Sequence, residues 1–349
     1  MSDSGFLFIW FFALAALILV LFFFREHLRK SGLISRSLNL VLLLVRFPPI
    51  EKKEDLSAEQ IRQKIALMEQ FYASLHVIKD SWWRTFIYGK PSFAMELTIP
   101  SVGEEISFYI AVPRRFARSV EKVIQGIFSE AHIEESRDYN IFNPEGEAVA
   151  SRAVLKINNF YPIKTYQKLE GDPIKSLTNV FTKLAKVGEG AALQVVARPA
   201  GIKWQRRLKE RARYLYEGKK EKNIMAKSVE VIEGLTVAPK SKEGLERIKQ
   251  EKREREEKER RLTPLEEEIV KGLEAKASKA LFETNISLVA SAATRSRSEE
   301  ILRSLEVAFA QFSDQNLNGF KTERVVGRVL KNLIFNFSFR NFVETKKVF

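Results

Sequence analysis

The sequence contains no cysteine and only three histidines among its 349 residues. Without cysteine the chain has no disulfide, no thiol nucleophile and no thiolate ligand for a metal, and this fits a reducing compartment. His27, His76 and His132 are far apart along the chain, and none has a companion at the spacing of metal ligands. A histidine-based metal site and a Ser-His-Asp triad are therefore not expected.

The motifs of common enzyme classes are missing as well. The phosphate-binding pattern G-x-x-x-x-G-K-[ST] is absent, and so are the protease signatures G-x-S-x-G and H-E-x-x-H. The carboxylate pairs Glu104-Glu105 and Glu134-Glu135 are interpreted as solvated surface charges rather than as catalytic groups. The sequence therefore predicts a non-catalytic protein without a cofactor or a bound metal.

Positive charge, by contrast, is in surplus, with a formal net charge of +14 at pH 7. Such a surplus favours polyanionic partners, which include anionic lipid headgroups, nucleic acid and the acidic face of another protein. A simpler interpretation is that a basic protein lies on an anionic membrane leaflet. The 45% share of hydrophobic residues is large enough for a sizeable core.

The first 24 residues are predicted to form a transmembrane anchor. Residues 5–24 (GFLFIWFFALAALILVLFFF) carry no charge, and a helix of about 20 residues spans the hydrocarbon core. Lys and Arg follow this run but do not precede it, which places the N-terminus outside and the rest of the chain in the cytoplasm. A cleaved signal peptide would need a basic start, a shorter apolar run and a small-x-small cleavage site, and all three are missing. The residues assigned to the anchor and its basic flank are Phe6, Trp10, Ile18, Phe24, Arg25, Arg29 and Lys30.

Residues 25–54 are predicted to form an interfacial linker that is both basic and apolar. Its apolar stretch at 38–45 (LNLVLLLV) is too short to span a membrane and lies between Arg36 and Arg46. Two alternatives remain open for it, a helix at the membrane interface and a helix in the core of the body. Pro48 and Pro49 are expected to end either helix.

Residues 55–200 are predicted to form a first α+β unit. Residues 55–75 have apolar side chains at helical spacing, and an aromatic-rich stretch follows at 82–86. Residues 93–99 (FAMELTI) and 106–112 (ISFYIAV) alternate as the two strands of a hairpin, and an amphipathic helix begins after Pro113. This order of strands and helix is typical of a ferredoxin-like unit.

The remaining chain divides into a charged insertion and a second α+β unit. Residues 201–278 are predicted to be a long charged helical insertion, because much of the stretch is rich in Lys, Arg and Glu and has almost no apolar face. Residues 279–349 begin with a strand at 282–290, and an amphipathic helix follows. The same strand–helix pattern occurs at 106–128 and 282–312. The predicted fold class is thus α+β, with an N-terminal transmembrane helix and two ferredoxin-like units.

A basic patch in the insertion is the strongest candidate for a binding site. Lys and Arg neutralise phosphates, and interleaved aromatic side chains can stack on unpaired bases or lie at the depth of lipid headgroups. The alternative is an amphipathic helix whose aromatic residues face the body. The residues of the predicted polyanion-binding patch are Lys203, Trp204, Arg206, Arg207, Lys209, Arg211 and Arg213.

Two segments carry a resemblance to a known family. They are residues 162–204, with PIKTYQKL, DPIKSLTNVFTKL and GEGAALQVVARPAGIKW, and residues 285–321, NISLVASAATRSRSEEILRSLEVAFAQFSDQNLNGFK. In spacing and in strand–helix order, residues 93–339 resemble the N-terminal membrane region of conjugative coupling ATPases of the TraD/TraG and HerA-like type, in versions from bacterial candidate phyla. That region anchors and orients a hexameric DNA pump at the inner membrane.

The chain departs from this family because it has neither Walker element of the motor domain. The resemblance therefore implies a non-catalytic scaffold or docking module of a type IV secretion or DNA-transfer machine. Its expected partners are the lipid bilayer, a separate or fused P-loop ATPase, DNA and further copies of the chain. Its expected location is the inner (plasma) membrane, as a single-pass protein. A general membrane-bound scaffold unrelated to DNA is the alternative.

Overall fold

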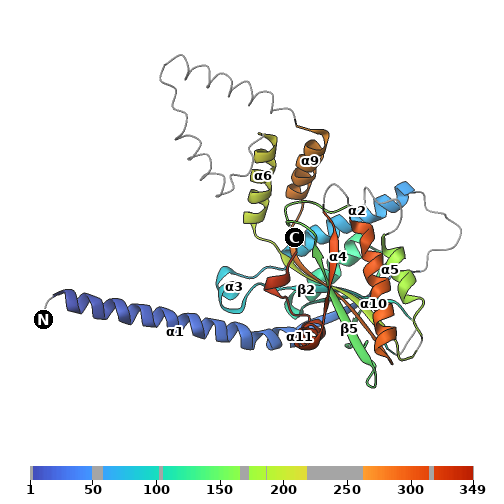
Figure 1. Cartoon of the computed structure of the whole chain (residues 1–349), viewed down its shortest axis with the longest axis horizontal. Helices are drawn as coiled ribbons and strands as arrows, with labels where there is room; N and C mark the ends of the chain where they lie inside the picture. Colours follow the sequence, from blue (N-terminus) through green and yellow to red (C-terminus); the bar gives the residue numbers. More distant parts are fainter. Residues whose placement is uncertain are drawn as a thin grey trace, which may run out of the picture.

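The computed structural model describes residues 3–48, 58–101, 105–165, 173–185, 187–217, 262–313 and 318–348. A long helix, α1 (Asp3–Leu38), projects from an α+β body, and the N-terminus lies at its far end (Figure 1). The body is built on one eight-stranded sheet in the order β4-β1-β3-β2-β6-β7-β5-β8. All neighbouring strands are antiparallel. This confirms the predicted α+β class and the apolar N-terminal helix.

The first half of the sheet is a βαββαβ unit. Its strands have the ferredoxin-like order β4-β1-β3-β2, and its helices α2 and α4 pack against each other. A short helix, α3 (Trp82–Tyr88), and the 3-10 turn η1 (Leu75–Val77) lie between α2 and β2. The other elements are β1 (Leu40–Arg46), α2 (Ala58–Ser74), β2 (Phe93–Ile99), β3 (Ser107–Pro113), α4 (Arg114–Ile127) and β4 (His132–Ser136).

The second half repeats this topology. Its strands have the order β6-β7-β5-β8, which is the same arrangement read from the other end, and α5 packs against α10. The elements are β5 (Glu147–Leu155), α5 (Pro173–Phe181), β6 (Gly190–Pro199), β7 (Phe282–Ala292), α10 (Arg295–Phe309), η3 (Ala310–Phe312) and β8 (Phe320–Val325). The predicted strand–helix pattern at 106–128 and 282–312 corresponds to β3–α4 and β7–α10, which occupy equivalent places in the two units.

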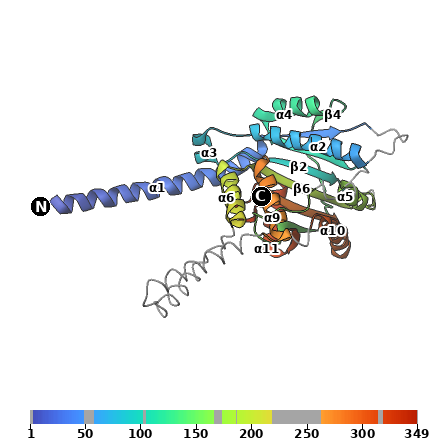
Figure 2. The ribbon, with the colours of Figure 1, turned by 90° about the horizontal axis from the view of Figure 1, so that it is seen from above.

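The two units join through their equivalent strands. Strands β2 and β6 pair from Phe93↔Ala197 to Ile99↔Ala191, so an approximate two-fold axis passes near the Glu96↔Gln194 pair. The alternation of β2 sends Phe93, Leu97 and Ile99 into the clusters beneath α2, α4, α5 and α10. All four helices therefore cover one face of the sheet, as Figure 2 shows from above.

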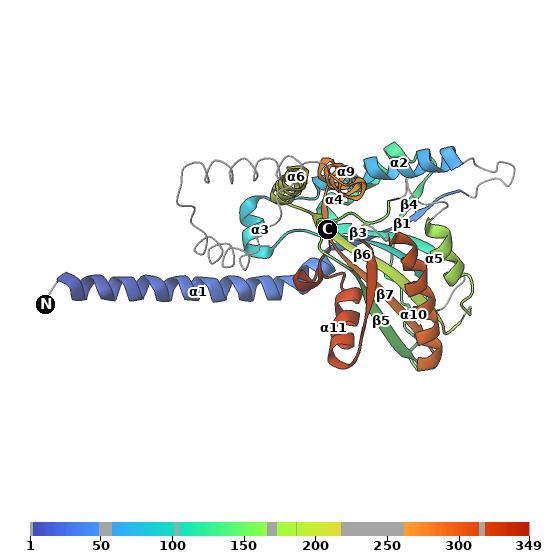
Figure 3. The same cartoon turned by 45° about the horizontal axis from the view of Figure 1, so that its top comes forward.

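The opposite face of the sheet is covered by the C-terminal part of the chain. Leu333 and Phe337 of α11 (Gly327–Ser338) pack on Ala192 and Val289. Figure 3 shows α10 and α11 on opposite sides of the sheet. The chain then returns through the 3-10 turn η4 (Glu344–Lys346) to a bridge between Val348 and Thr284. The C-terminal segment is thus an integral layer of the fold.

A helical hairpin extends the β6–β7 connection away from the sheet. Helices α6 (Ile202–Tyr216) and α9 (Pro264–Ser278) project side by side and bury Leu208, Ala212 and Leu273 between them (Figure 1). The second helix begins with a capping box between Thr263 and Glu266. Much of the charged stretch within the predicted insertion, residues 218–261, lies outside the described residues.

The structure corrects the predicted boundaries in two places. Residues 40–46 form strand β1 between β3 and β4, with five consecutive buried residues, and not an interfacial linker or a helix. A short, continuously apolar run is compatible with a strand buried on both faces, and periodicity alone does not distinguish that strand from a helix. The boundary between the units falls at residues 137–146 rather than at 200, because β6 pairs with β7 across the insertion.

Candidate functional site

Helix α1 presents an exposed apolar surface from Trp10 to Phe24. Trp10, Ile18 and Phe24 are 64%, 59% and 59% exposed, and the stretch Trp10–Leu28 has a mean hydropathy of 2.0 with none of it buried in the body. In the part of the chain that the structure describes, this is the one helix long and apolar enough to cross a membrane. The side chains of the other predicted anchor residues Phe6, Arg29 and Lys30 lie outside the described part.

The helix does not stop where the apolar run ends. It continues for 14 residues past Phe24 to Leu38, which corresponds to about 21 Å at 1.5 Å per residue. Only Asn39 separates it from β1, and the Asn39 amide donates to the carbonyl of Arg36 while its carbonyl accepts from the Arg114 amide. The predicted anchor and the sheet are therefore joined without a loop.

Helix α3 packs against this continuation of α1. The Arg25 Nε donates to the Phe86 carbonyl at 3.2 Å, and its guanidinium lies 4.5 Å from the centre of the Phe86 ring. Gly32 of α1 lies beside the Tyr88 ring, and a Cβ at this position would be in ordinary van der Waals contact with that ring, at 3.8 Å. The outer side of α3 carries Trp82 and Trp83, which are 81% and 51% exposed. An aromatic surface thus lies beside the point at which α1 becomes charged.

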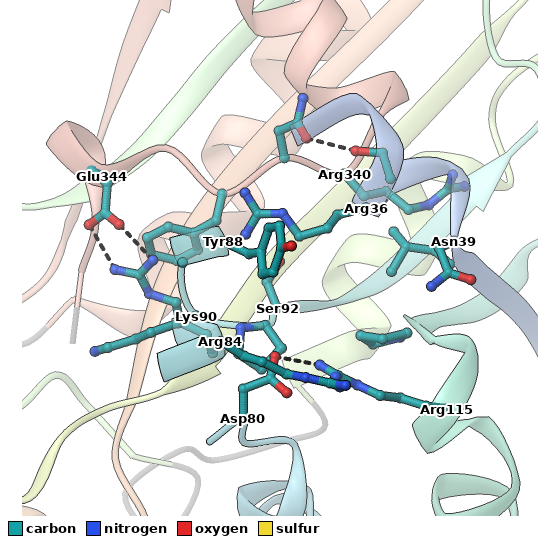
Figure 4. A pocket seen from close by; sticks show the side chains of 18 of the residues that line it. Arg36, Asn39, Asp80, Arg84, Tyr88, Lys90, Ser92, Arg115, Arg340 and Glu344 are labelled. Carbon is teal, nitrogen blue, oxygen red and sulfur yellow. Dashed lines mark hydrogen bonds and ion pairs between the residues drawn. The ribbon is translucent and has the colours of Figure 1, made fainter. Parts of the chain in front are cut away.

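A cavity of about 840 Å³ opens between α1, α3, the ends of the strands and the C-terminal segment. Figure 4 shows its side chains, which come from both ends of the sequence. Six of them are basic: Arg36, Arg84, Lys90, Arg115, Arg198 and Arg340. Three of them are acidic: Glu26, Asp80 and Glu344.

The inner wall of the cavity is held by paired charges. Arg198 forms two hydrogen bonds of 2.7 Å with the Glu344 carboxylate and one of 2.6 Å with the buried Glu283, which also accepts from Lys90 at 3.2 Å. The hydrogen bonds from Arg198 hold the pKa of Glu344 down to about 2. Arg115 and Asp80 form a further pair at 2.5 Å. These pairs hold the side chains of the wall in place and neutralise much of its positive charge.

Arg84 differs from the paired cations of the wall. It is exposed on α3, and no described residue forms an ion pair with it. Arg36, on the opposite side of the cavity, donates from its Nε to the Gly32 carbonyl of its own helix. The cavity therefore combines a prearranged inner wall with the exposed guanidinium group of Arg84 at its α3 side, which suits an anionic oxygen ligand.

The predicted polyanion-binding patch lies on α6, in the helical hairpin. Lys203, Arg206, Arg207, Lys209 and Arg213 are exposed, whereas Arg211 is half-buried. Trp204 packs on Phe160 with 6.0 Å between ring centres, and the Arg207 guanidinium lies 5.4 Å from its ring. Tyr214 and Tyr216 remain exposed. The aromatic residues are thus divided between the core of the hairpin and its surface, and polyanion binding stays a prediction.

Sequence reasoning missed the cavity because its walls are contributed by residues from Glu26 to Glu344. The only sequence feature near the cavity that stood out was the aromatic stretch at 82–86, which belongs to α3. Within the described ranges, no group of His, Asp or Glu is arranged to hold a metal ion.

Residues 57–348 match the family described as "Domain of unknown function (DUF8128)". The chain belongs to the DUF8128 family. No curated protein is similar enough to count as a relative. The match begins after α1 and β1, so the DUF8128 region contributes α3 and most of the cavity wall, while α1 closes the cavity from outside that region.

Proposed function

We propose that this DUF8128 protein is a non-catalytic, membrane-anchored scaffold that serves as a docking module of a type IV secretion or DNA-transfer machine. Helix α1 crosses the inner membrane once, with the N-terminus outside and the double ferredoxin-like body in the cytoplasm. The body offers surfaces to further copies of the chain and to a separate or fused P-loop ATPase. The basic helix α6 contacts DNA.

The observation that carries this proposal is the exposed, uninterrupted helix α1. An apolar helix that is unburied over 19 residues needs a nonaqueous environment, and a bilayer matches its length. The helix enters the sheet directly through β1, as expected for an anchor that fixes the body in place. The basic side chains at Arg25 and Arg36 follow the apolar run, which supports the orientation.

Membrane extraction and protease protection test the anchor. The intact protein is expected to stay with inner membranes after washing with high salt and alkaline carbonate, and a variant lacking residues 1–24 is expected to leave them. In spheroplasts, external protease should spare the body. Digestion of the body from outside, or release of the full chain by salt, would refute the membrane arrangement.

Salt-dependent DNA binding separates the DNA-linked proposal from a general membrane scaffold. The full chain in nanodiscs of phosphatidylcholine is expected to bind duplex or single-stranded DNA, with an affinity that falls as salt rises. Charge reversal at the exposed Arg206, Arg207 and Lys209 should abolish this binding. The matched control reverses Arg118, Lys122 and Lys331, which are exposed on other helices. Equal losses in both variants would favour a scaffold unrelated to DNA.

A further inference from the structure

We propose that α3 and the mouth of the basic cavity form a binding site for an anionic phospholipid of the bilayer that α1 crosses. Trp82, Trp83 and Phe86 lie at headgroup depth, and Arg84 binds the lipid phosphate at the cavity mouth. This inference rests on the proposed membrane anchor and adds to it a specific contact between the body and the membrane surface.

The depth of α3 follows from its contacts with α1. The uncharged run ends at Phe24, so Arg25 is the first side chain that must leave the hydrocarbon. Arg25 contacts Phe86 through both the carbonyl at 3.2 Å and the ring at 4.5 Å. Helix α3 is therefore held at the level where α1 passes from the acyl chains into the headgroups.

The exposed side chains of α3 have the chemistry of this layer. Trp82, Trp83, Phe86 and Tyr88 are 81%, 51%, 53% and 48% exposed, although the helix has only seven residues. Single exposed apolar residues are ordinary on a soluble surface, but Trp82, Trp83 and Phe86 lie within about 100° of one another around the helix and form a patch. Trp and Tyr are enriched where membrane meets water, because one part of each ring system is apolar and the other can be hydrated.

The cavity lies where a headgroup can enter it. Glu26 and Arg36 of α1 both line it, and ten residues of helix correspond to about 15 Å. The cavity thus extends from headgroup depth toward the sheet.

Arg84 supplies the phosphate contact at the mouth. It lies on the side of α3 that lines the cavity together with Tyr88, and Figure 4 shows the ends of Arg84 and Arg115 near Asp80. Arg115 is already paired with Asp80, so Arg84 keeps its guanidinium available for a phosphate.

Fluorescence quenching by brominated lipids tests the depth of α3 in the full chain. The protein has four tryptophans, and the double variant W10F/W204F leaves Trp82 and Trp83 as the reporters. In nanodiscs of phosphatidylcholine and phosphatidylglycerol, lipids brominated near the glycerol should quench these tryptophans more strongly than lipids brominated near the chain ends. Emission that no brominated lipid changes would overturn the inference.

A companion variant separates this result from a failure of the anchor. W82F/W83F/W204F keeps Trp10, which lies within the apolar span. If Trp10 is quenched while Trp82 and Trp83 are not, the anchor stands and the lipid site is refuted. If none of the three is quenched, the membrane anchor itself is refuted.

The role of Arg84 is tested by changing the lipid charge. Replacing part of the phosphatidylcholine with phosphatidylglycerol should increase the quenching of Trp82 and Trp83. Arg84→Gln should remove this increase, and the control Arg118→Gln, an exposed arginine on α4, should keep it. An unchanged dependence on phosphatidylglycerol in Arg84→Gln would exclude the proposed phosphate contact.

Discussion

Glu96 is a buried carboxylate at the junction of the two units, and three side chains hydrogen-bond to it. Gln194 donates at 2.7 Å, the Tyr139 hydroxyl at 2.9 Å, and the Arg340 guanidinium at 2.9 and 3.1 Å. Burial by itself lowers the pKa of Arg340, but the charges of Glu96 and Asp138 outweigh it and the net pKa is raised. A buried charge is stable only when its polar partners are in place. The Glu96 cluster therefore holds Arg340, which follows α11, against the strands at the junction of the two units.

Gly190 is a position where any side chain collides with the backbone. A Cβ there would lie 2.2 Å from the Ile141 carbonyl oxygen. We therefore expect Gly190→Ala to lower the free energy of unfolding by about 1–3 kcal/mol or more, because main-chain atoms must move. Urea denaturation followed by circular dichroism measures this.

Gly126 in α4 provides the matched control for that substitution. A Cβ at Gly126 meets no heavy atom within 4 Å. Gly126→Ala should stabilise the protein by about 0.5–1 kcal/mol, since alanine loses less conformational freedom in a helix. A Gly190→Ala variant as stable as the wild type would contradict the close contact with Ile141.

At the scale of single elements, the buried end of α9 makes the helical hairpin sensitive to pH. Burial lowers the pKa of Lys276 to about 8, and its ammonium donates to the Asn159 carbonyl. Between about pH 8 and the unfolded value near 10.5, the unfolded chain holds a proton that the folded chain has lost. Stability therefore rises with pH in this window, by at most about 3 kcal/mol.

Urea denaturation of wild type and Lys276→Met at several pH values between 7 and 11 checks this prediction, with the pH range set by the lowered and the ordinary lysine pKa. The wild type should gain stability relative to Lys276→Met as the pH rises through the window. Lys271→Met changes an exposed position of the same helix, and its free energy of unfolding should vary with pH in the same way as that of the wild type. A constant difference between wild type and Lys276→Met would refute the effect of burial.

Sequence patterns predict elements best where a strand has one apolar face and its partner follows at once. The hairpin at 93–99 and 106–112 meets both conditions and is confirmed by β2 and β3. Strand β1 meets neither, because it is apolar on both faces and pairs with residues more than 60 positions away. The pairing of β6 with β7 is also nonlocal, which is why the second unit was predicted to begin too late. The cavity is harder to predict from the sequence than either strand pairing, because its charged residues are far apart along the chain and come together only when these strands pair.

At the scale of the whole molecule, the DUF8128 match and the folding unit do not coincide. The match starts at residue 57, whereas the sheet needs β1, whose residues Val41–Val45 are buried between β3 and β4. Five buried apolar side chains contribute roughly 8–15 kcal/mol at about 1.5–3 kcal/mol each, which is comparable to the stability of a whole domain. We expect residues 57–349 alone to aggregate or to unfold without cooperativity.

The control for this truncation is the chain of residues 36–349, which keeps β1 and the hydrogen bond from Ser37 to Asn341. It should elute as a discrete species in size-exclusion chromatography and unfold cooperatively in urea. If residues 57–349 unfolded at the same midpoint and with the same cooperativity, β1 would be dispensable.

The single residue between α1 and β1 has a mechanical consequence. Asn39 is the only residue between α1 and β1, and α3 contacts α1 from the side. We therefore expect α1 and the sheet to move as one rigid unit. In a bilayer crossed by α1 as proposed, a thinner membrane that increases the tilt of this helix would therefore tilt the whole body through the same angle.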